Sequence, residues 1–246
     1  TGGVASGAQA QPERADRGER LERLAREING CRRCPRLVEW REACAAEPPR
    51  RYAGEEYFAR PLEGFGDPEA PVALVGLAPA AHGGNRTGRI FTGDRSGDWL
   101  FAALWRTSFA NRPESQGRND GLRLQGAFVT AVVRCAPPQN RPTPAERDEC
   151  LGYLERELDL LEQVTVIVCL GSFAWDGALR AARALGHPAP RPKPRFSHGA
   201  EAAVGPWTML GCFHPSQQNT FTGRLTEPMT DSVLRRARDL AGLPAA

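Results

Sequence analysis

Four short, largely apolar runs recur along the chain, and they constrain its fold more than any other feature. They cover residues 72–77, 127–133, 164–170 and 207–213. Because these runs do not alternate regularly between apolar and polar residues, strands formed there would be buried on both faces. Stretches with helical periodicity separate the runs. This alternation predicts an α/β fold in which helices cover both faces of a mostly parallel sheet.

The predicted helices occupy 96–109, 144–161, 173–185 and 229–240, and two more, at 17–28 and 35–46, precede the first strand. The clearest start is Thr143-Pro144, where a threonine N-cap is followed by proline at the first helical position. There is no internal repeat, and the proline-rich segment 186–195 is interpreted as a surface loop. We therefore expect a single domain over residues 17–246, preceded by a flexible N-terminal tail at 1–16.

The composition is that of an ordinary globular protein, with 246 residues, 41% hydrophobic and 25% charged. No run approaches the roughly 20 apolar residues of a membrane helix, and the polar N-terminal segment lacks the apolar core of a secretory signal. We expect a cytoplasmic monomer with no membrane partner. The net charge of +3 does not by itself indicate nucleic acid. Lys193 is the only lysine among 32 basic residues, so 31 are arginines, which suit phosphate contacts, although a GC-rich genome would produce the same bias.

Four of the seven cysteines have a spacing suited to metal ligation. Cys31 and Cys34 form a C-x-x-C followed by proline, Cys135 lies in the loop after the second predicted strand, and Cys150 lies in the next helix. The C-x-x-C precedes the first strand, which argues against a thioredoxin motif. Four thiolates can hold zinc or an iron–sulfur cluster, and the spacing does not separate the two. The remaining cysteines are expected to be structural, although the first of them could replace a ligand: Cys44, Cys169 and Cys212.

Two long loops follow the first and fourth predicted strands. The first reads GLAPAAHG over residues 76–83, and the second reads HPSQQNTFTGR over residues 214–224. Both leave the carboxyl ends of strands, where an open α/β sheet binds its ligands. The first seven residues of the first loop include no Ser, Cys, Asp, Glu or Lys, so they offer neither a nucleophile nor a carboxylate base.

Taken together, these motifs closely resemble the uracil-DNA glycosylase superfamily, and within it family 5, the iron–sulfur-containing type. The matching stretches are the CxxCP segment, GLAPAAHG with NRTGRIFTGDRSGD, VRCAPPQNRPTP and HPSQQNTFTGRLT, in that order along the chain. The resemblance implies a three-layer α/β/α sandwich around a four-stranded, mostly parallel sheet. Other superfamily members place Asp, Asn or Glu in the first loop, and inert residues there are typical of family 5.

The resemblance also implies an activity and a cofactor. The activity is removal of uracil, and of other deaminated bases, from DNA. The cofactor is a structural [4Fe–4S] cluster held by four thiolates: Cys31, Cys34, Cys135 and Cys150.

Hydrolysis of an N-glycosidic bond develops positive charge on the sugar and negative charge on the departing base. Asp94 is the predicted residue to position the water, with N-capping of the next helix as the alternative. Asn140 can hold water or read a base edge, or it can simply form a turn beside prolines. His214 can donate to a base oxygen. Phe91 can stack on the base, or it can pack in the core.

The other predicted site residues shape the pocket or contact DNA. Glycine and alanine let the backbone approach a flipped base, and polar residues of the second loop can hold phosphates. With Phe91, the predicted binding residues are Gly76, Ala78, Pro79, Ala80, His82, Gly83, Asn85, Ser216, Gln218, Asn219, Thr220 and Arg224.

Two other functions remain open on the sequence. An iron–sulfur electron carrier or redox sensor would explain the cysteines but not the two loops. A non-catalytic Cys₄ nucleic-acid-binding module would explain the arginines but not Asp94. For a glycosylase, attack by a lysine amine is disfavoured, because Lys193 lies between two prolines outside both strand-end loops. We therefore expect hydrolysis by water, leaving an abasic site in an intact strand.

Overall fold

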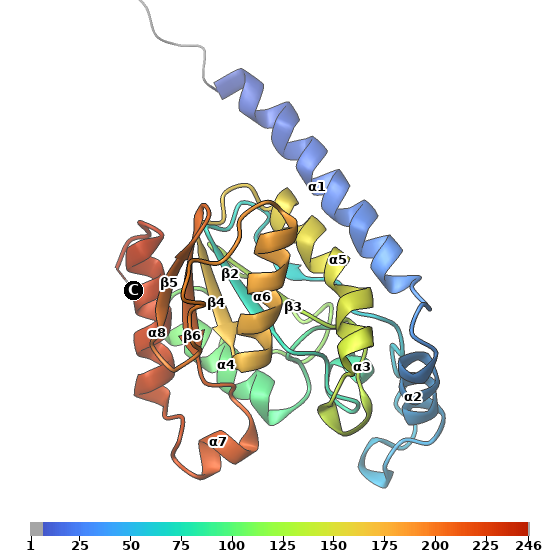
Figure 1. The fold of residues 1–246 in the computed structure, drawn as a ribbon. Coiled ribbons are helices and arrows are strands. Elements are labelled where there is room, and N and C mark those ends of the chain that lie inside the picture. Colours follow the sequence, from blue (N-terminus) through green and yellow to red (C-terminus); the bar gives the residue numbers. More distant parts are fainter. Residues whose placement is uncertain (1–6, 246) are drawn as a thin grey trace, which may run out of the picture.

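The computed structural model describes residues 7–245, which form a central sheet with helices on both faces (Figure 1). The sheet has six strands in the order β1-β3-β2-β4-β6-β5. Their bounds are β1 Phe65–Gly66, β2 Val72–Gly76, β3 Ala127–Ala131, β4 Val166–Leu170, β5 Glu201–Val204 and β6 Trp207–Cys212.

The four inner strands are parallel, as the apolar runs predict. Val72 of β2 is level with Ala127 of β3 on one side and with Val166 of β4 on the other, and Val166 is level with Thr208 of β6. The predicted count of four strands is wrong, because a short antiparallel strand closes each edge of the sheet. β1 has only two residues, and β5 is half exposed, so neither has the continuous apolar run of an inner strand.

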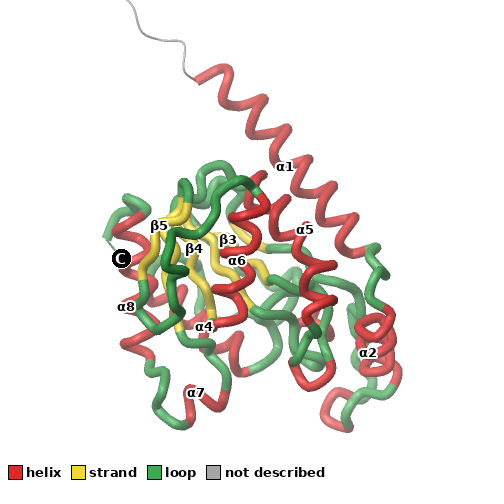
Figure 2. The backbone as a smooth tube through the Cα atoms, in the orientation of Figure 1, coloured by secondary structure: helices red, strands yellow, loops and turns green. Residues whose placement is uncertain are grey.

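The helices form two outer layers, and Figure 2 shows them on either side of the strands. On one face α6 packs on the sheet, α5 packs on α6 and α1 packs on α5, whereas α4 and α8 pair on the other face. The bounds are α1 Gly7–Asn29, α2 Pro35–Ala46, α3 Gly84–Thr87, α4 Arg95–Arg106, α5 Pro144–Leu160, α6 Ser172–Ala184, α7 Gln217–Phe221 and α8 Glu227–Leu240, with 3₁₀ turns at Arg50–Tyr52 and Pro138–Asn140.

The first helix begins inside the segment that the sequence predicts to be a tail. Residues 7–16, expected in a flexible tail, form the first turns of α1, and residues 1–6 of that tail lie outside the described residues. The segment contains Ala, Gln, Glu and Arg, which are good helix formers, so low hydrophobicity does not exclude a helix. Over residues 7–245, no helix combines the length and apolarity needed to cross a bilayer.

The core lies on both faces of the inner strands. Ala73 and Val75 of β2 point toward α5 and α6, and Val72 and Leu74 point toward α4 and α8, as the alternation of a strand requires. Cys169 and Cys212 are buried on opposite faces, which confirms their predicted place in the core.

One buried ion pair joins β3 to α5. Arg134, just after β3, donates two hydrogen bonds to the carboxylate of Glu157, at 3.0 and 2.6 Å. The two side chains are 1% and 2% exposed. Glu157 also accepts from the Thr130 hydroxyl and from the Gly64 backbone N–H. Both oxygens of the Glu157 carboxylate accept hydrogen bonds, and the pair therefore anchors the start of the 134–143 loop.

Replacing one partner of this pair should be costly. Glu157→Gln leaves the Arg134 charge buried without a counter-ion, so we expect a loss of about 3 kcal/mol in the free energy of unfolding. Equilibrium unfolding in urea measures the loss. Glu27→Gln is the control, because it breaks the exposed pair with Arg156 and should leave stability nearly unchanged. Equal midpoints for the two variants would contradict a structural role for the Arg134–Glu157 pair.

Candidate active site

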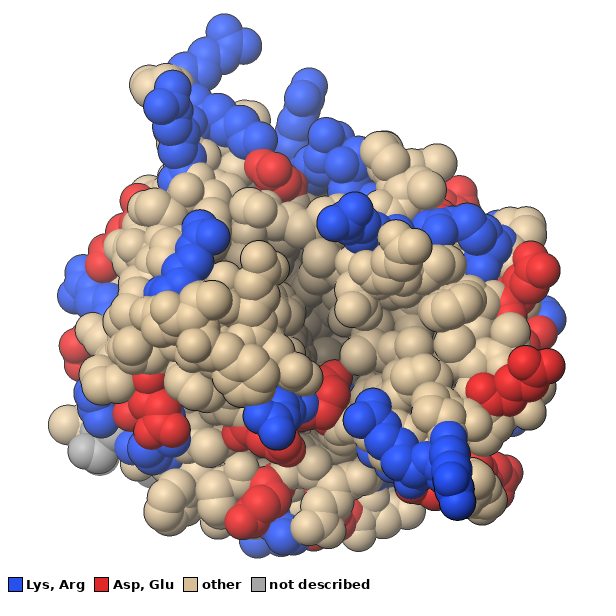
Figure 3. Space-filling view, turned by 90° about the horizontal axis from the view of Figure 1, so that it is seen from below, with Lys and Arg blue, Asp and Glu red and all other residues tan. Residues whose placement is uncertain are grey.

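A cavity of about 460 Å³ opens at the carboxyl ends of the inner strands. It lies on the face that carries α7, which Figure 3 shows hollowed near its centre, with Lys and Arg side chains around much of the rim. A more open hollow of about 590 Å³ lies beside α2 and contains neither strand-end loop. The residues that line the strand-end cavity are Leu77, Ala78, Ala80, Phe91, Asp94, Arg95, Ser96, Asn140, His214, Ser216, Gln217 and Gln218.

Among the residues that the structure describes, Asp94 is the only carboxylate that lines this cavity. It is the N-cap of α4, and its Oδ1 accepts from the Gly97 backbone N–H at 3.0 Å. Oδ2 lies beside Gly83, where an added Cβ would stand only 2.3 Å away. Asp94 therefore does cap α4, but the cap uses only one carboxylate oxygen and leaves the other for the cavity.

Phe91 forms part of the wall beside Asp94. Its ring lies over Gly76, the last residue of β2, where an added Cβ would be 2.5 Å from the ring. The ring centroid is 5.9 Å from that of His214, and the two planes are inclined by 34°. The Phe91 backbone has φ +54°, a left-handed conformation that is unusual for an aromatic residue. Phe91 is mostly buried, as core packing requires, and it also lines the cavity, so stacking on a base stays a prediction.

His214 follows β6 and brings an imidazole to the same cavity. Burial lowers the pKa of His214, against the opposing effect of the Asp94 charge. The imidazole is therefore neutral near pH 7, and a neutral imidazole still has one N–H to donate. The carbonyl oxygen of His214 accepts from the Asn219 side-chain amide at 2.8 Å, which folds the second loop back on itself.

Asn140 and the first loop complete the wall. Asn140 lies in the 3₁₀ turn after β3, is exposed, and has φ +56°. The inert turn after β2 lines the cavity through Leu77, Ala78 and Ala80. Predicted residues that do line the cavity are Ala78, Ala80, Phe91, Asp94, Asn140, His214, Ser216 and Gln218.

Several other predicted residues lie behind the cavity wall. Asn85 is 1% exposed, and its side chain donates to the Arg41 carbonyl oxygen at 3.1 Å, so it points toward α2. His82 contacts the Tyr57 hydroxyl through Nδ1 at 3.0 Å. Burial, helped by two arginine charges, lowers the pKa of His82. Gly76 and Gly83 act by making room for Phe91 and Asp94. Pro79 is buried beside Gly84.

In the second loop, Asn219 and Thr220 brace the loop, and Arg224 stacks on Phe213 at 4.7 Å from the ring centroid. Four wall residues were not predicted as site residues: Leu77, Arg95, Ser96 and Gln217. Their positions inside the same motif loops were the available signal. Leu77 has no polar group, and the side-chain chemistry of Ser96 and Gln217 does not distinguish them from the polar residues beside them.

The four cysteines of the predicted metal site surround one narrow pocket. They come from the end of α1 (Cys31), the N-cap of α2 (Cys34), the loop after β3 (Cys135) and α5 (Cys150). Among the residues described, no three His, Cys, Asp or Glu side chains are gathered as ligands of a single ion. All four thiols are free, as is that of the buried Cys44.

The environments of these thiols differ. Burial raises the pKa of Cys135 to about 11 and that of Cys150 to about 12. Burial also acts to raise the pKa of Cys31, but hydrogen bonds from Arg33 and Tyr153 outweigh it, and the pKa falls below its ordinary value. The Arg134 backbone N–H donates to the Cys150 sulfur at 3.3 Å.

Arg41 lies against the same pocket from α2. It is 2% exposed, and its guanidinium donates to the Cys135 sulfur at 3.0 Å and to the Cys31 carbonyl oxygen at 3.3 Å. The Nε of Arg41 has no hydrogen-bond partner. A buried cation thus contacts a cysteine sulfur.

Comparison with known proteins agrees with this architecture. Residues 63–238 match the family model described as the uracil DNA glycosylase superfamily. The type-5 uracil-DNA glycosylase of Mycobacterium tuberculosis (strain CDC 1551 / Oshkosh) is 52% identical over 88% of this chain and 80% of its own length. That of Thermus thermophilus is 48% identical over 90% of this chain and 99% of its own length. A type-4 uracil-DNA glycosylase of Archaeoglobus fulgidus is 31% identical over 63% of this chain and 62% of its own length.

The chain therefore belongs to the uracil DNA glycosylase superfamily. Within it, the chain groups with the type-5 proteins, as its motifs predict.

Proposed function

We propose that this protein removes uracil, and other deaminated bases, from DNA by hydrolysing the N-glycosidic bond with water. The observation that carries this proposal is the cavity at the strand ends, where Asp94, Asn140, His214 and Phe91 meet in a member of this superfamily. An electron carrier or a non-catalytic binding module would leave this cavity without a use.

Asp94 is the group that orients the water and offsets positive charge on the sugar. Its Oδ1 is occupied by the cap of α4, and its Oδ2 is available to accept a hydrogen bond from water. The cap holds the carboxylate in one place, which is what a positioned base requires. Asn140, on the same cavity wall, supplies an amide that can hold the water from a second side.

Phe91 and His214 receive the base. The Phe91 ring offers a planar surface on which any base can stack. The neutral His214 imidazole donates to the oxygen on which negative charge develops as the bond breaks. Leu77, Ala78 and Ala80 offer no polar group that would select one base edge, which favours a broad choice of deaminated bases.

Arg95 on the cavity wall and two further arginines carry charges that can hold DNA. Arg51, Arg95 and Arg224 each place a guanidinium over an aromatic ring, at 4.7, 5.1 and 4.7 Å from the ring centroid. In the part of the chain that the structure describes, none of the three has a carboxylate within ion-pair distance. These charges are free for phosphates. Phe221, at the end of α7, is 67% exposed and can fill the gap that a flipped base leaves.

Cys31, Cys34, Cys135 and Cys150 would hold a [4Fe–4S] cluster. Four thiolates bring negative charge to a buried site, and Arg41 provides a buried cation there with an Nε that has no partner. The residues therefore fit an anionic cluster. When bound, the cluster would tie α1, α2, α5 and the loop after β3 together, and the proposed hydrolysis does not pass through it.

Asp94→Asn should lower the rate of uracil release about 100-fold or more, because an amide cannot accept a proton. Asparagine is also a good N-cap, so α4 should remain intact. Single-turnover release from a duplex with one uracil measures the rate, and binding to an uncleavable 2′-fluoro duplex should stay near that of the wild type. The matched control is Asp98→Asn, on the exposed side of the same helix. A wild-type rate in Asp94→Asn would leave this residue only its capping role.

The cluster predicts a brown protein that contains iron and sulfide. Cys150→Ala should lose most of both and should unfold at a lower temperature, whereas Cys169→Ala, in the core of β4, should keep them. Metal and acid-labile sulfide analysis of anaerobically purified protein checks this. Stoichiometric zinc without iron in the wild type would rule out the cluster.

Hydrolysis by water predicts no covalent intermediate. Lys193 cannot serve as the amine of a Schiff base, because its Nζ lies 2.6 Å from the Asp176 carboxylate on α6, outside the cavity. Borohydride added to enzyme and uracil-containing DNA should therefore trap no adduct. An adduct that disappears in Lys193→Arg would contradict this mechanism.

A further inference from the structure

The turn of residues 90–94 contains two residues of the proposed active site, and its backbone is strained. Phe91 has φ +54°, a conformation that persists only where the surroundings hold it. Its carbonyl oxygen is pressed against α4, so closely that a Cβ on Gly97 would stand 1.8 Å away. The ring and the Asp94 carboxylate can therefore keep their directions only if the whole turn is held.

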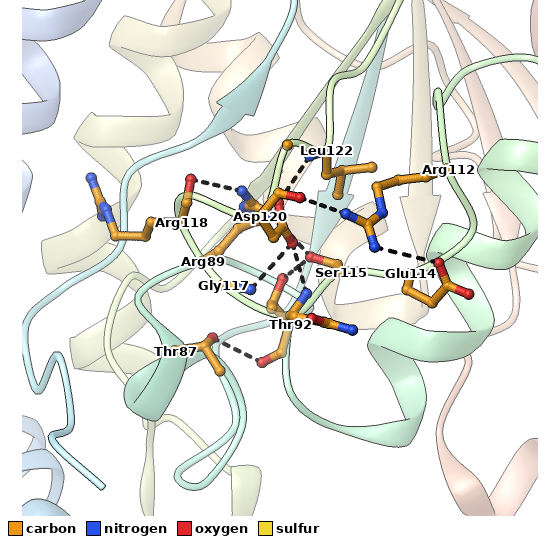
Figure 4. Close-up of polar contacts among 12 residues, drawn as sticks. Thr87, Arg89, Thr92, Arg112, Glu114, Ser115, Gly117, Arg118, Asp120 and Leu122 are labelled. Carbon is orange, nitrogen blue, oxygen red and sulfur yellow. Dashed lines mark hydrogen bonds and ion pairs between the residues drawn. The ribbon is translucent and has the colours of Figure 1, made fainter.

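Thr92 holds the turn from the inside. It is fully buried, and its hydroxyl lies 2.6 Å from the Ser115 hydroxyl. The Thr92 carbonyl oxygen accepts from the Thr87 hydroxyl at 3.0 Å. Ser115 in turn accepts from Arg89 Nη1 at 3.0 Å (Figure 4). A polar chain of contacts thus reaches the residue between Phe91 and Gly93.

Asp120 closes this chain from the 111–122 loop. One carboxylate oxygen accepts from Arg89 at 2.8 Å and from the backbone N–H groups of Gln116 and Gly117, and the other accepts from the Leu122 N–H at 2.9 Å. The Arg89 and Asp120 side chains are only 4% and 7% exposed. Although burial acts to raise the pKa of Asp120, these hydrogen bonds lower it to about 2, so the carboxylate is ionised at neutral pH.

None of Thr92, Ser115, Arg89 or Asp120 lines the cavity. They cannot touch a base or the attacking water, so any effect on the reaction must pass through Phe91 and Asp94. Figure 4 shows the contacts that link Asp120 and Arg89 of this network, through Ser115, to Thr92.

We propose that Asp120, Arg89, Ser115 and Thr92 are positioning residues, forming a clamp by which the 111–122 loop holds Phe91 and Asp94 in their working geometry. This inference rests on the proposed function of the cavity, since it concerns how that site is held in place.

The test compares Thr92→Val, which keeps the shape but removes the hydroxyl, with Thr92→Ser, which keeps the hydroxyl. In single-turnover uracil release, Thr92→Val should be roughly tenfold or more slower, since misplacement by about 1 Å can cost up to 100-fold. Affinity for the 2′-fluoro-uracil duplex should change less than about twofold, and Thr92→Ser should recover most of the rate. In an Asp94→Asn background, Thr92→Val should slow release less than it does in the wild type, because part of its effect passes through the Asp94 carboxylate. Thr107→Val, which removes an equally buried hydroxyl at the end of α4, should release uracil at the wild-type rate.

Amide hydrogen exchange tests the clamp without relying on the release of uracil. Thr92→Val should speed amide exchange in residues 90–97, whereas Thr92→Ser and Thr107→Val should not. If Thr92→Val exchanged faster but the wild-type protein released no uracil, the clamp would be supported and the proposed function would be overturned. If Thr92→Val released uracil and exchanged amide hydrogens at wild-type rates, the clamp would be overturned and the proposed function would stand. The same conclusion would follow if the rate effects of Thr92→Val and Asp94→Asn simply multiplied in the double variant.

Discussion

The structure depends on one constraint: four parallel strands, buried on both faces, must end at the same edge of the sheet. Apolar side chains on both sides leave no polar face to orient these strands otherwise. Their carboxyl ends therefore bring together loops that are far apart in the sequence, after β2, β3 and β6. The cavity between these loops contains the carboxylate, the amide, the imidazole and the aromatic ring of the proposed reaction.

An inert first loop suits this arrangement, because shape is what the loop contributes. Gly76 and Gly83 leave room for the Phe91 ring and for Asp94 Oδ2, and a side chain at either position would displace a neighbour. Within residues 7–245, the only carboxylate on the wall comes instead from the N-cap of α4, whose own hydrogen bond fixes its direction. Capping and catalysis, which compete as interpretations of the sequence, are compatible in the structure because a carboxylate has two oxygens.

The periodic features of the sequence predicted most of the fold, including α2 to the residue and all four inner strands. β1 and α7 were missed because elements of two and five residues have no measurable periodicity. Asn85 was placed in the cavity, but the single turn of α3 directs it toward α2. The contacts of Arg89 with Ser115 and Asp120 join positions 26 and 31 residues apart, and no local pattern encodes such a pairing.

The strand-end cavity is proposed to break the bond between a deaminated base and its sugar. The most direct test is to incubate excess enzyme with a duplex containing a single deoxyuridine and to quantify free uracil by chromatography. We expect about one equivalent of free uracil and a strand that breaks only after alkali, with no base released from the matched thymidine duplex. Release of no free base from either duplex at enzyme excess would show that this cavity does not cleave the bond.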